Sequence, residues 1–251
     1  MFNNIKEAEN EFNYIVKYCP QYLVHLLGVV LYTASRGHHP FLAAAQAFQE
    51  SRFDPTKKNK SSTALGILQQ LNEYICENGP EPRLLDQAKI NDCKINPDPY
   101  TRFRRTNPAH ACELYCRGME KLWKFALNAK MDDYQDIVFR YAMGVAPVRK
   151  PDNAQLYDHY MRYTYELFNF SYPVVVKGFF SVFGNISNFN SWIDKLNREA
   201  PEYIQENDTI PDRSKWKKFF FDTNRYPVPV FGYTENEVKA LDPTWKRCAM
   251  T

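Results

Sequence analysis

A single carboxylate stands at the end of a strongly apolar segment. The segment runs from Phe41 to Phe48, contains an Ala-Ala-Ala run typical of a helix, and is followed by Glu50. A carboxyl group in this place loses water and lies at the negative end of the helix dipole, and both effects raise its pKa. A glutamate with a raised pKa can protonate a glycosidic oxygen near neutral pH, as general acid catalysis requires.

A second stretch whose residues could bind a substrate follows after a polar loop. It reads Gly-Ile-Leu-Gln and spans Gly66 to Gln69. Glycine lets a backbone approach a neighbouring group closely, and glutamine can hydrogen-bond an amide or a sugar hydroxyl. The two stretches together predict a site that binds a sugar-like substrate and protonates it.

Three motifs in this order resemble those of the lytic transglycosylase family, whose lysozyme-like fold is related to goose-type lysozyme. The family motif Glu-Ser-x-Phe-x-Pro matches Glu50 to Pro55 at every fixed position, and Gly-Leu-Met-Gln matches Gly66 to Gln69 with two apolar replacements. The third motif, Ala-Tyr-Asn-x-Gly, corresponds to Arg140 to Gly144, which keeps Tyr141 and the glycine but has Ala142 instead of asparagine. The resemblance covers roughly residues 21–170, and the stretch from Asp158 to Tyr163 is similar to the helix with which the family domain ends.

The resemblance implies that Glu50 protonates the bond between N-acetylmuramic acid and N-acetylglucosamine in peptidoglycan. The same carboxylate then takes a proton from the muramoyl C6 hydroxyl, which closes a 1,6-anhydro ring without water. The N-acetyl group of the sugar can stabilise the cationic centre, so no second enzyme carboxylate is required. By this resemblance Ser51, Gly66 and Gln69 bind or orient the substrate, and Tyr141 binds the substrate or positions Glu50 by a hydrogen bond. No metal or cofactor is expected. Ala142 removes one orienting contact.

Two other functions stay open at this point. A hydrolysing muramidase would use the same Glu50 with water as the acceptor, and Asp54 would be the candidate for a second carboxylate. Because Asp54 directly precedes a proline, a turn residue is the favoured interpretation. A non-catalytic structural protein that keeps the fold as a scaffold would account for Ala142 and for an aromatic C-terminal part.

The elements that must position these residues are predicted to be helices. Apolar residues recur at helical spacing before and after Pro20, and no stretch before residue 172 demands a strand. We therefore predict a mainly α fold: an N-terminal helix in 1–20, a lysozyme-like transglycosylase domain in 21–170 and an aromatic-rich C-terminal extension in 171–251. The helices expected after residue 40 are Phe41–Phe48, Ala64–Tyr74, Leu84–Ile90, Ala109–Ala129, Asp133–Met143 and Ala154–Phe168, with a polar loop over 54–62.

Composition and charge exclude several classes of protein. With 44% hydrophobic and 24% charged residues the chain is globular and not disordered, and a net charge of +3 is too small for a nucleic-acid binder. The apolar run from Tyr22 to Tyr32 is too short to span a bilayer, and Met1 to Asn13 lacks the apolar core of a signal peptide. The cysteines are sparse, so reduced and mostly buried thiols are expected at Cys19, Cys76, Cys93, Cys112, Cys116 and Cys248.

Two clusters of basic and ionisable residues have less specific interpretations. A proline-rich stretch is locally basic because it contains Arg102, Arg104 and Arg105. These arginines could form a solvated face or a surface that binds the acidic peptide stems of peptidoglycan. His38 and His39 precede a helix start, are expected to be exposed, and form no metal-binding pattern.

Aromatic residues become denser after Pro173 and include the run Phe219-Phe220-Phe221. This segment could line a sugar-binding groove, pack on the helical body or dock onto a larger assembly, and docking is the favoured interpretation. An enzyme that acts in the periplasm or cell wall but lacks a signal peptide would be made in the cytoplasm and carried to its site of action by a larger assembly. A bacteriophage virion that opens the wall fits this expectation; an endolysin released at lysis and a secretion-system component fit it as well. The expected partners are peptidoglycan glycan strands and, through residues 171–251, a virion or another assembly; no nucleic acid and no transmembrane segment are expected.

Overall fold

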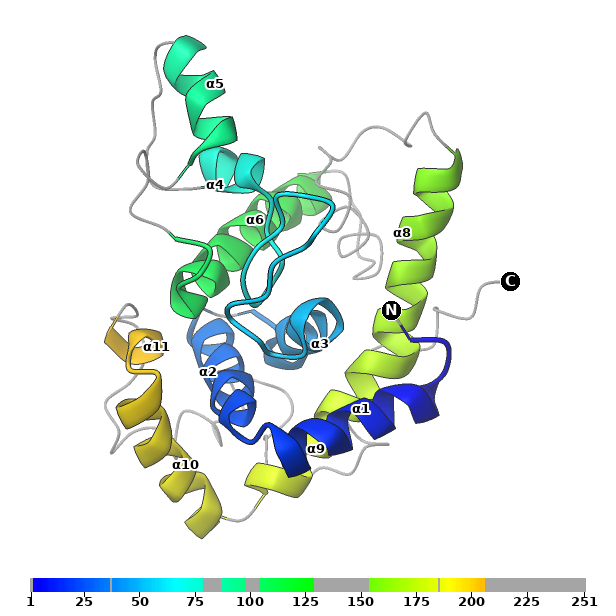
Figure 1. The fold of residues 1–251 in the computed structure, drawn as a ribbon, viewed down its shortest axis with the longest axis vertical. Coiled ribbons are helices and arrows are strands. Elements are labelled where there is room, and N and C mark those ends of the chain that lie inside the picture. Colours follow the sequence, from blue (N-terminus) through cyan, green and yellow to red (C-terminus); the bar gives the residue numbers. More distant parts are fainter. Residues whose placement is uncertain are drawn as a thin grey trace.

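The computed structural model describes residues 2–36, 38–78, 87–97, 104–128, 154–184 and 186–205, and of these it describes only the backbone at 123–128, 154–158, 186–187 and 205. The described residues confirm the mainly α prediction (Figure 1). Their β pairing is limited to two isolated bridges, Lys58 with Leu65 and Leu65 with Gln70. The helical elements are α1 (Ile5–Tyr18), α2 (Gln21–Ser35), α3 (Pro40–Ser51), α4 (Asn72–Asn78), α5 (Gln87–Ile95), α6 (Pro108–Asn128), α8 (Ala154–Glu166), the π-helix η2 (Leu167–Ser171), α9 (Tyr172–Phe183), α10 (Ile186–Glu199) and α11 (Glu202–Gln205).

The structure confirms two helices on either side of the break predicted at Pro20. Asn4 caps α1, because its side-chain oxygen accepts a hydrogen bond of 3.0 Å from the backbone N–H of Glu7. The break before α2 falls at Pro20. Helix α1 buries one face, through residues such as Phe12 and Ile15, whereas α2 is buried on nearly all sides. Helix α1 therefore covers the surface of the body and α2 lies in its core.

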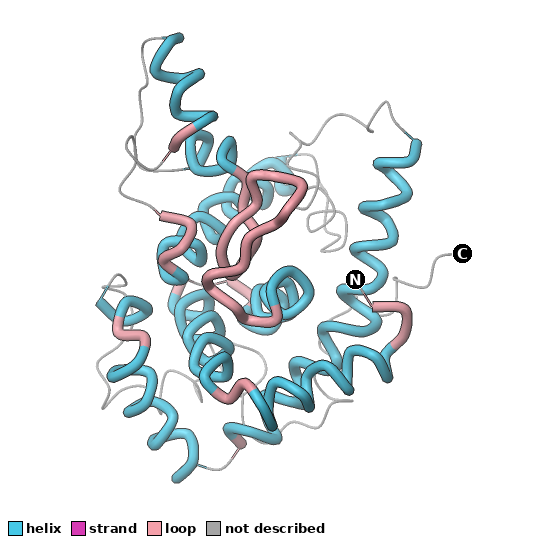
Figure 2. The backbone as a smooth tube through the Cα atoms, viewed as in Figure 1, coloured by secondary structure: helices cyan, strands magenta, loops and turns pink. Residues whose placement is uncertain are grey.

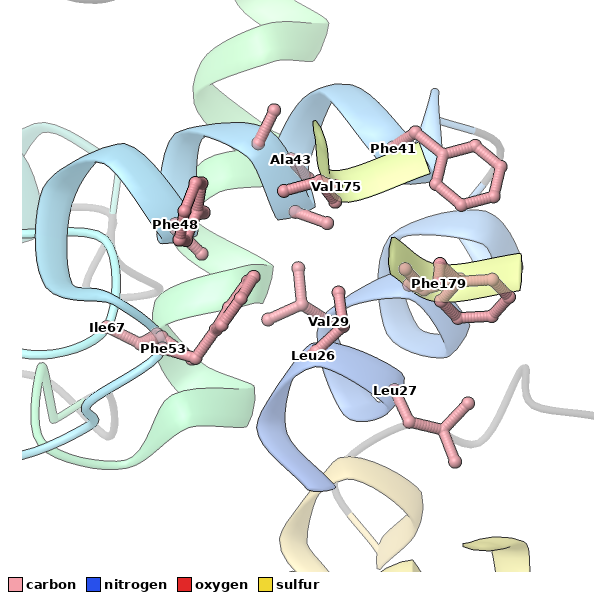
Figure 3. Packing of buried hydrophobic residues seen from close by; sticks show 14 of the residues in the cluster. Leu26, Leu27, Val29, Phe41, Ala43, Phe48, Phe53, Ile67, Val175 and Phe179 are labelled. Atoms are coloured by element: carbon pink, nitrogen blue, oxygen red, sulfur yellow. The ribbon is translucent and has the colours of Figure 1, made fainter. Parts of the chain in front are cut away.

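Helix α3 lies at the centre of the core, and every residue from Pro40 to Gln49 is buried. Its alanines allow close approach of the neighbouring helices α2 and α9, and Figure 3 shows Ala43 next to Val175 of α9. At the other end of α3 the rings of Phe48 and Phe53 stack with centroids 5.6 Å apart. The core thus holds α3 along its whole length, and with it the position of Glu50.

Two histidines connect the start of α3 to other helices. The ring of His39 caps α3, since Nδ1 accepts from the backbone N–H of Leu42 at 3.4 Å, and Nε2 lies 3.3 Å from the hydroxyl of Tyr172 on α9. His38 Nε2 lies 3.6 Å from a carboxylate oxygen of Glu120 on α6. The expectation that both histidines are exposed is wrong, because they are half-buried between packed helices.

A disulfide joins Cys76 of α4 to Cys93 of α5. The expectation of reduced thiols is wrong for this pair, because α4 and α5 pack against each other and bring together two residues that are 17 apart in sequence. The same expectation is confirmed for Cys112 and Cys116, which are free and buried in α6. Burial raises the pKa of both thiols.

Residues 172–204 pack in the same core as α2 and α3. Helix α8 continues through η2 into α9, which buries Val175 and Phe179 against α3 (Figure 3). A Cβ atom on Gly28 of α2 would lie 2.4 Å from the ring of Tyr203, so α11 packs directly on α2. The boundary expected at residue 171 therefore falls inside a continuous run of helix. The run Phe219-Phe220-Phe221 lies outside the described residues.

Membrane crossing by the described helices would depend on their length and apolar character. No single one of them is both long and apolar enough for it. Two sharply bent pairs meet both conditions when each pair is taken together, namely Ile5–Tyr18 with Gln21–Ser35 and His159–Phe183 with Asn188–Glu199.

Candidate active site

Glu50 lies in the last turn of α3, and its side chain is half-buried. Burial raises the pKa of its carboxyl group, while a hydrogen bond from Tyr163 of α8 and the positive charge of Arg52 oppose this shift without cancelling it. The upward direction expected from the sequence is thereby confirmed. Tyr160 is also nearby: burial and then the charge of Glu50 raise the pKa of its phenol. Two tyrosines one turn apart on α8 thus lie beside a carboxyl group that is suited to donate a proton.

Gln49 holds α8 in place beside Glu50. Its buried side-chain amide donates to the backbone carbonyl of Tyr163 at 3.1 Å and accepts from the hydroxyl of Ser171 at 3.0 Å. The amide nitrogen therefore binds α8 and the amide oxygen binds η2, which continues α8. This arrangement keeps the Tyr163 hydroxyl near the Glu50 carboxyl group.

Tyr163 was not among the site residues assigned from the sequence. The sequence analysis assigned the hydrogen bond to Glu50 to Tyr141. Tyr141 and the rest of the motif from Arg140 to Gly144 lie outside the described residues. The sequence feature that could have indicated Tyr163 is its spacing from Tyr160, which puts both on one face of a predicted helix. This helix lies in the stretch that is similar to the end of the family domain. That spacing is also typical of ordinary packing, so it marks no site by itself.

Ser51 ties the end of α3 to the second motif. Its hydroxyl is buried, with 3% of the residue exposed, and lies 2.7 Å from the carbonyl oxygen of Ile67 and 3.0 Å from that of Ala47. One hydroxyl hydrogen is shared between these two acceptors. Ser51 is therefore placed as a positioning residue, because it holds the loop of the second motif against the turn that carries Glu50.

Arg52 covers the carboxyl end of α3 in the left-handed conformation, with φ at 62°. Its guanidinium donates to the carbonyl oxygens of Phe48 at 2.7 Å and Gln49 at 2.8 Å and lies 4.1 Å above the ring of Phe2. A cation at this end of a helix satisfies carbonyl groups that have no partner within the helix. The first motif leaves this position variable, so the sequence analysis assigned it no role.

The second motif forms a hairpin turn and not the helix expected from Ala64 to Tyr74. Leu65 and Gln70 exchange backbone hydrogen bonds of 3.1 and 3.2 Å, and the N–H of Gly66 donates to the carbonyl of Lys57 at 2.9 Å. Figure 2 shows the loop between α3 and α4 folded back on itself, with its arms side by side. The helix prediction is wrong here because the turn needs left-handed backbone at Gly66 (φ 82°) and Gln69 (φ 47°), which tertiary contacts stabilise.

Gln69 and Arg105 both hold the hairpin together. The Gln69 amide nitrogen donates to the carbonyls of Lys57 and Gly66, each at 2.9 Å, so a substrate contact by this side chain would use its oxygen. The buried guanidinium of Arg105 donates to the carbonyls of Thr63 and Gln70. Arg105 is therefore neither part of a solvated face nor available for acidic peptide stems. Arg104 is exposed, and Arg102 lies outside the described residues.

Asp54 is a turn residue, as predicted. Its Oδ1 accepts hydrogen bonds from the backbone N–H of Thr56 at 2.8 Å and from the Thr56 hydroxyl at 2.7 Å. A hydrogen bond between Asp54 and Tyr22 also contributes to the raised pKa of that phenol, after burial. The carboxylate is thus used to shape the loop after α3.

For the glycan cleavage that the sequence resemblance implies, Tyr163→Phe should lower the rate about tenfold and move the basic limb of the pH–rate profile to higher pH. The Tyr163 hydrogen bond favours the carboxylate of Glu50, so its loss raises the Glu50 pKa and keeps the acid protonated to higher pH. The measurement is the cleavage rate as a function of pH. Tyr165→Phe, on the same helix and in edge-to-face contact with Phe170, is the matched control. A limb that stays in place or moves to lower pH would contradict the assignment of Tyr163.

Gly66→Ala should destabilise the protein by more than about 2 kcal/mol, because a backbone clash adds to the cost of positive φ. A Cβ atom at Gly66 would lie 2.0 Å from the carbonyl oxygen of Arg105. Urea unfolding measures the effect, with Lys58→Ala at an exposed position of the same hairpin as the control. Equal unfolding midpoints for Gly66→Ala and the wild type would show that this close approach is not required.

The described residues contain no group of three or more His, Cys, Asp or Glu side chains that could hold a metal ion. No family model, no curated protein and no solved structure matches this chain.

Proposed function

We propose that the protein is a peptidoglycan lytic transglycosylase with a lysozyme-like helical domain. It would cleave the β-1,4 bond between N-acetylmuramic acid and N-acetylglucosamine and leave a 1,6-anhydro end. The observation that carries the proposal is the placement of Glu50, a carboxyl group with a raised pKa at the end of a fully packed helix. The contact between Ser51 and Ile67 supports it further, since it joins the first two of the three motifs that carry the family resemblance.

The residues around Glu50 suit both halves of this reaction. In the first half protonated Glu50 donates its proton to the glycosidic oxygen, and burial favours that protonated form. In the second half the carboxylate accepts the proton of the C6 hydroxyl while the C6 oxygen bonds to C1. The Tyr163 hydrogen bond stabilises the carboxylate between the two steps.

The hydrogen bonds that Asp54 accepts favour transglycosylation over hydrolysis. An enzyme that activates water commonly uses a second carboxylate as a base. The carboxylate of Asp54 instead accepts two hydrogen bonds from Thr56. This supports a mechanism in which Glu50 acts first as the acid and then as the base.

Product analysis tests the proposal. Purified sacculi are digested in water enriched in ¹⁸O, and the soluble muropeptides are analysed by mass spectrometry. A transglycosylase releases 1,6-anhydro ends without ¹⁸O, because the ring closes on an oxygen of the sugar. Reducing ends that carry one ¹⁸O would identify a hydrolysing muramidase, and the absence of any product would favour a scaffold protein.

A further inference from the structure

The loop between α3 and α4 carries an exposed cluster of positive charge. Lys57, Lys58 and Lys60 lie within residues 56–63, all of which are exposed, and we call this segment the lysine tip. The chain from Pro55 to Asn72 contains no acidic residue. The one carboxylate of the loop, Asp54, precedes this segment and accepts its hydrogen bonds from Thr56, so the loop as a whole keeps a net positive charge.

Hydrogen bonds within the loop order the lysine tip even though it buries no side chain. The Asn59 side-chain oxygen accepts from the backbone N–H and the hydroxyl of Ser61, both at 2.9 Å, and the N–H of Asn59 donates to the carbonyl of Ala64 at 3.0 Å. A loop that is ordered before binding loses less conformational entropy when a ligand binds. The lysine tip is thus a preorganised cationic surface.

The lysine tip is directly connected to the candidate active site. The carbonyl of Lys57 accepts from Gly66 and from the Gln69 side chain, and the neighbouring Ile67 accepts from Ser51, which follows Glu50. In Figure 2 this loop is the pink segment that begins at the end of α3 and folds back on itself, and the bridge between Lys58 and Leu65 places residues 59–64 at one of its turns. A polymer bound at Glu50 and along the hairpin would therefore pass near these lysines.

The lysine tip suits single ion pairs with several separate carboxylates better than paired hydrogen bonds to one carboxylate or phosphate. A lysine ammonium acts as a hydrated point charge, whereas arginine is the residue that forms paired hydrogen bonds to one carboxylate or phosphate. Arg105 cannot serve here, since its guanidinium is bound to the hairpin carbonyls. Three separated ammonium groups match an array of carboxylates spaced along a polymer.

We propose that the lysine tip binds the carboxylates of the peptide stems of peptidoglycan while the glycan strand lies at Glu50. The position of this binding surface relative to the strand rests on the proposed function. Exposed ion pairs of this kind each contribute little, so three of them together are expected to change the affinity about tenfold at low salt and less at high salt.

The test compares two triple variants in the Glu50→Gln background, which prevents digestion of the ligand during the measurement. The first variant combines Lys57→Gln, Lys58→Gln and Lys60→Gln. The control combines Lys6→Gln, Lys17→Gln and Lys89→Gln, which removes the same charge from exposed positions on α1 and α5. Binding is measured by co-sedimentation with purified sacculi, and with sacculi whose stem carboxylates have been amidated.

We expect the lysine-tip variant to bind intact sacculi about tenfold more weakly than its parent, and the control within about twofold of it. On amidated sacculi parent and variant should bind equally. Equal losses in both triple variants, no loss in the lysine-tip variant, or a loss that persists on amidated sacculi would overturn the inference. If the lysine-tip effect is found but the wild type releases no 1,6-anhydro ends, the proposed reaction fails while the binding surface stands.

Discussion

Glu50→Gln should reduce the release of glycan products about a thousandfold, because glutamine keeps the shape of the side chain but donates no proton to a leaving oxygen. The measurement is the rate at which 1,6-anhydro muropeptides appear from purified sacculi, together with loss of turbidity. Glu73→Gln, at an exposed position of α4, removes the same charge and should leave the rate unchanged. Equal rates for wild type and Glu50→Gln would contradict the catalytic assignment.

The same substitution should leave the protein folded and stabilise it at neutral pH by about 1 kcal/mol. The pKa of Glu50 is raised in the fold, so the folded chain holds this proton more tightly than the unfolded chain. Stability from this group is present at low pH and is lost as pH rises through the folded pKa. Glu50→Gln removes that loss, and thermal unfolding at several pH values should show the two proteins converging at acidic pH. A destabilised variant at neutral pH would contradict burial as the cause of the shift.

A chain that ends at Ser171 should not fold. Removal of the helices after this residue exposes the faces of α2 and α3 and deletes apolar side chains that are fully buried in the common core, namely Val175, Phe179, Phe183, Ile193, Leu196 and Tyr203. At roughly 1.5–3 kcal/mol for each buried side chain, the loss is comparable to the entire stability of an ordinary domain.

Circular dichroism and thermal unfolding measure this second prediction. A chain that ends at Gln205 keeps every described helix and serves as the control, for which we expect cooperative unfolding. Cooperative unfolding of the chain that ends at Ser171 would show instead that residues 21–170 form an independent domain, as the sequence pattern suggested.

The elements next to the candidate site were predicted well where local signals agree. Pro40 at the first position of α3, the alanine run within it and the polar loop after it all indicate the same helix. Glu50 could therefore be placed at the end of a buried helix, with a raised pKa, from its neighbours in sequence alone. Asp54 could be assigned to a turn in the same way, because its partner Thr56 is two residues away.

The predictions that failed depend on contacts between distant residues. The hairpin at Gly66 depends on hydrogen bonds with Lys57 and Arg105, and no local sequence pattern predicts these bonds. The disulfide between Cys76 and Cys93 requires the packing of α4 against α5. Tyr163 reaches Glu50 only because Gln49 binds the backbone of α8.

The sequence by itself therefore determined the helical character of the chain, the helix that carries Glu50 and the order of the two motifs. These follow from propensities, caps and turns, whose interactions lie within a few residues. Only the tertiary structure decided that Tyr163 contacts the Glu50 carboxyl group and that Ser51 and Arg105 position the hairpin at Gly66. It also decided that residues 172–204 complete the core. Each of these depends on burial and on hydrogen bonds between segments far apart in the chain, and such contacts leave no periodic pattern in the sequence.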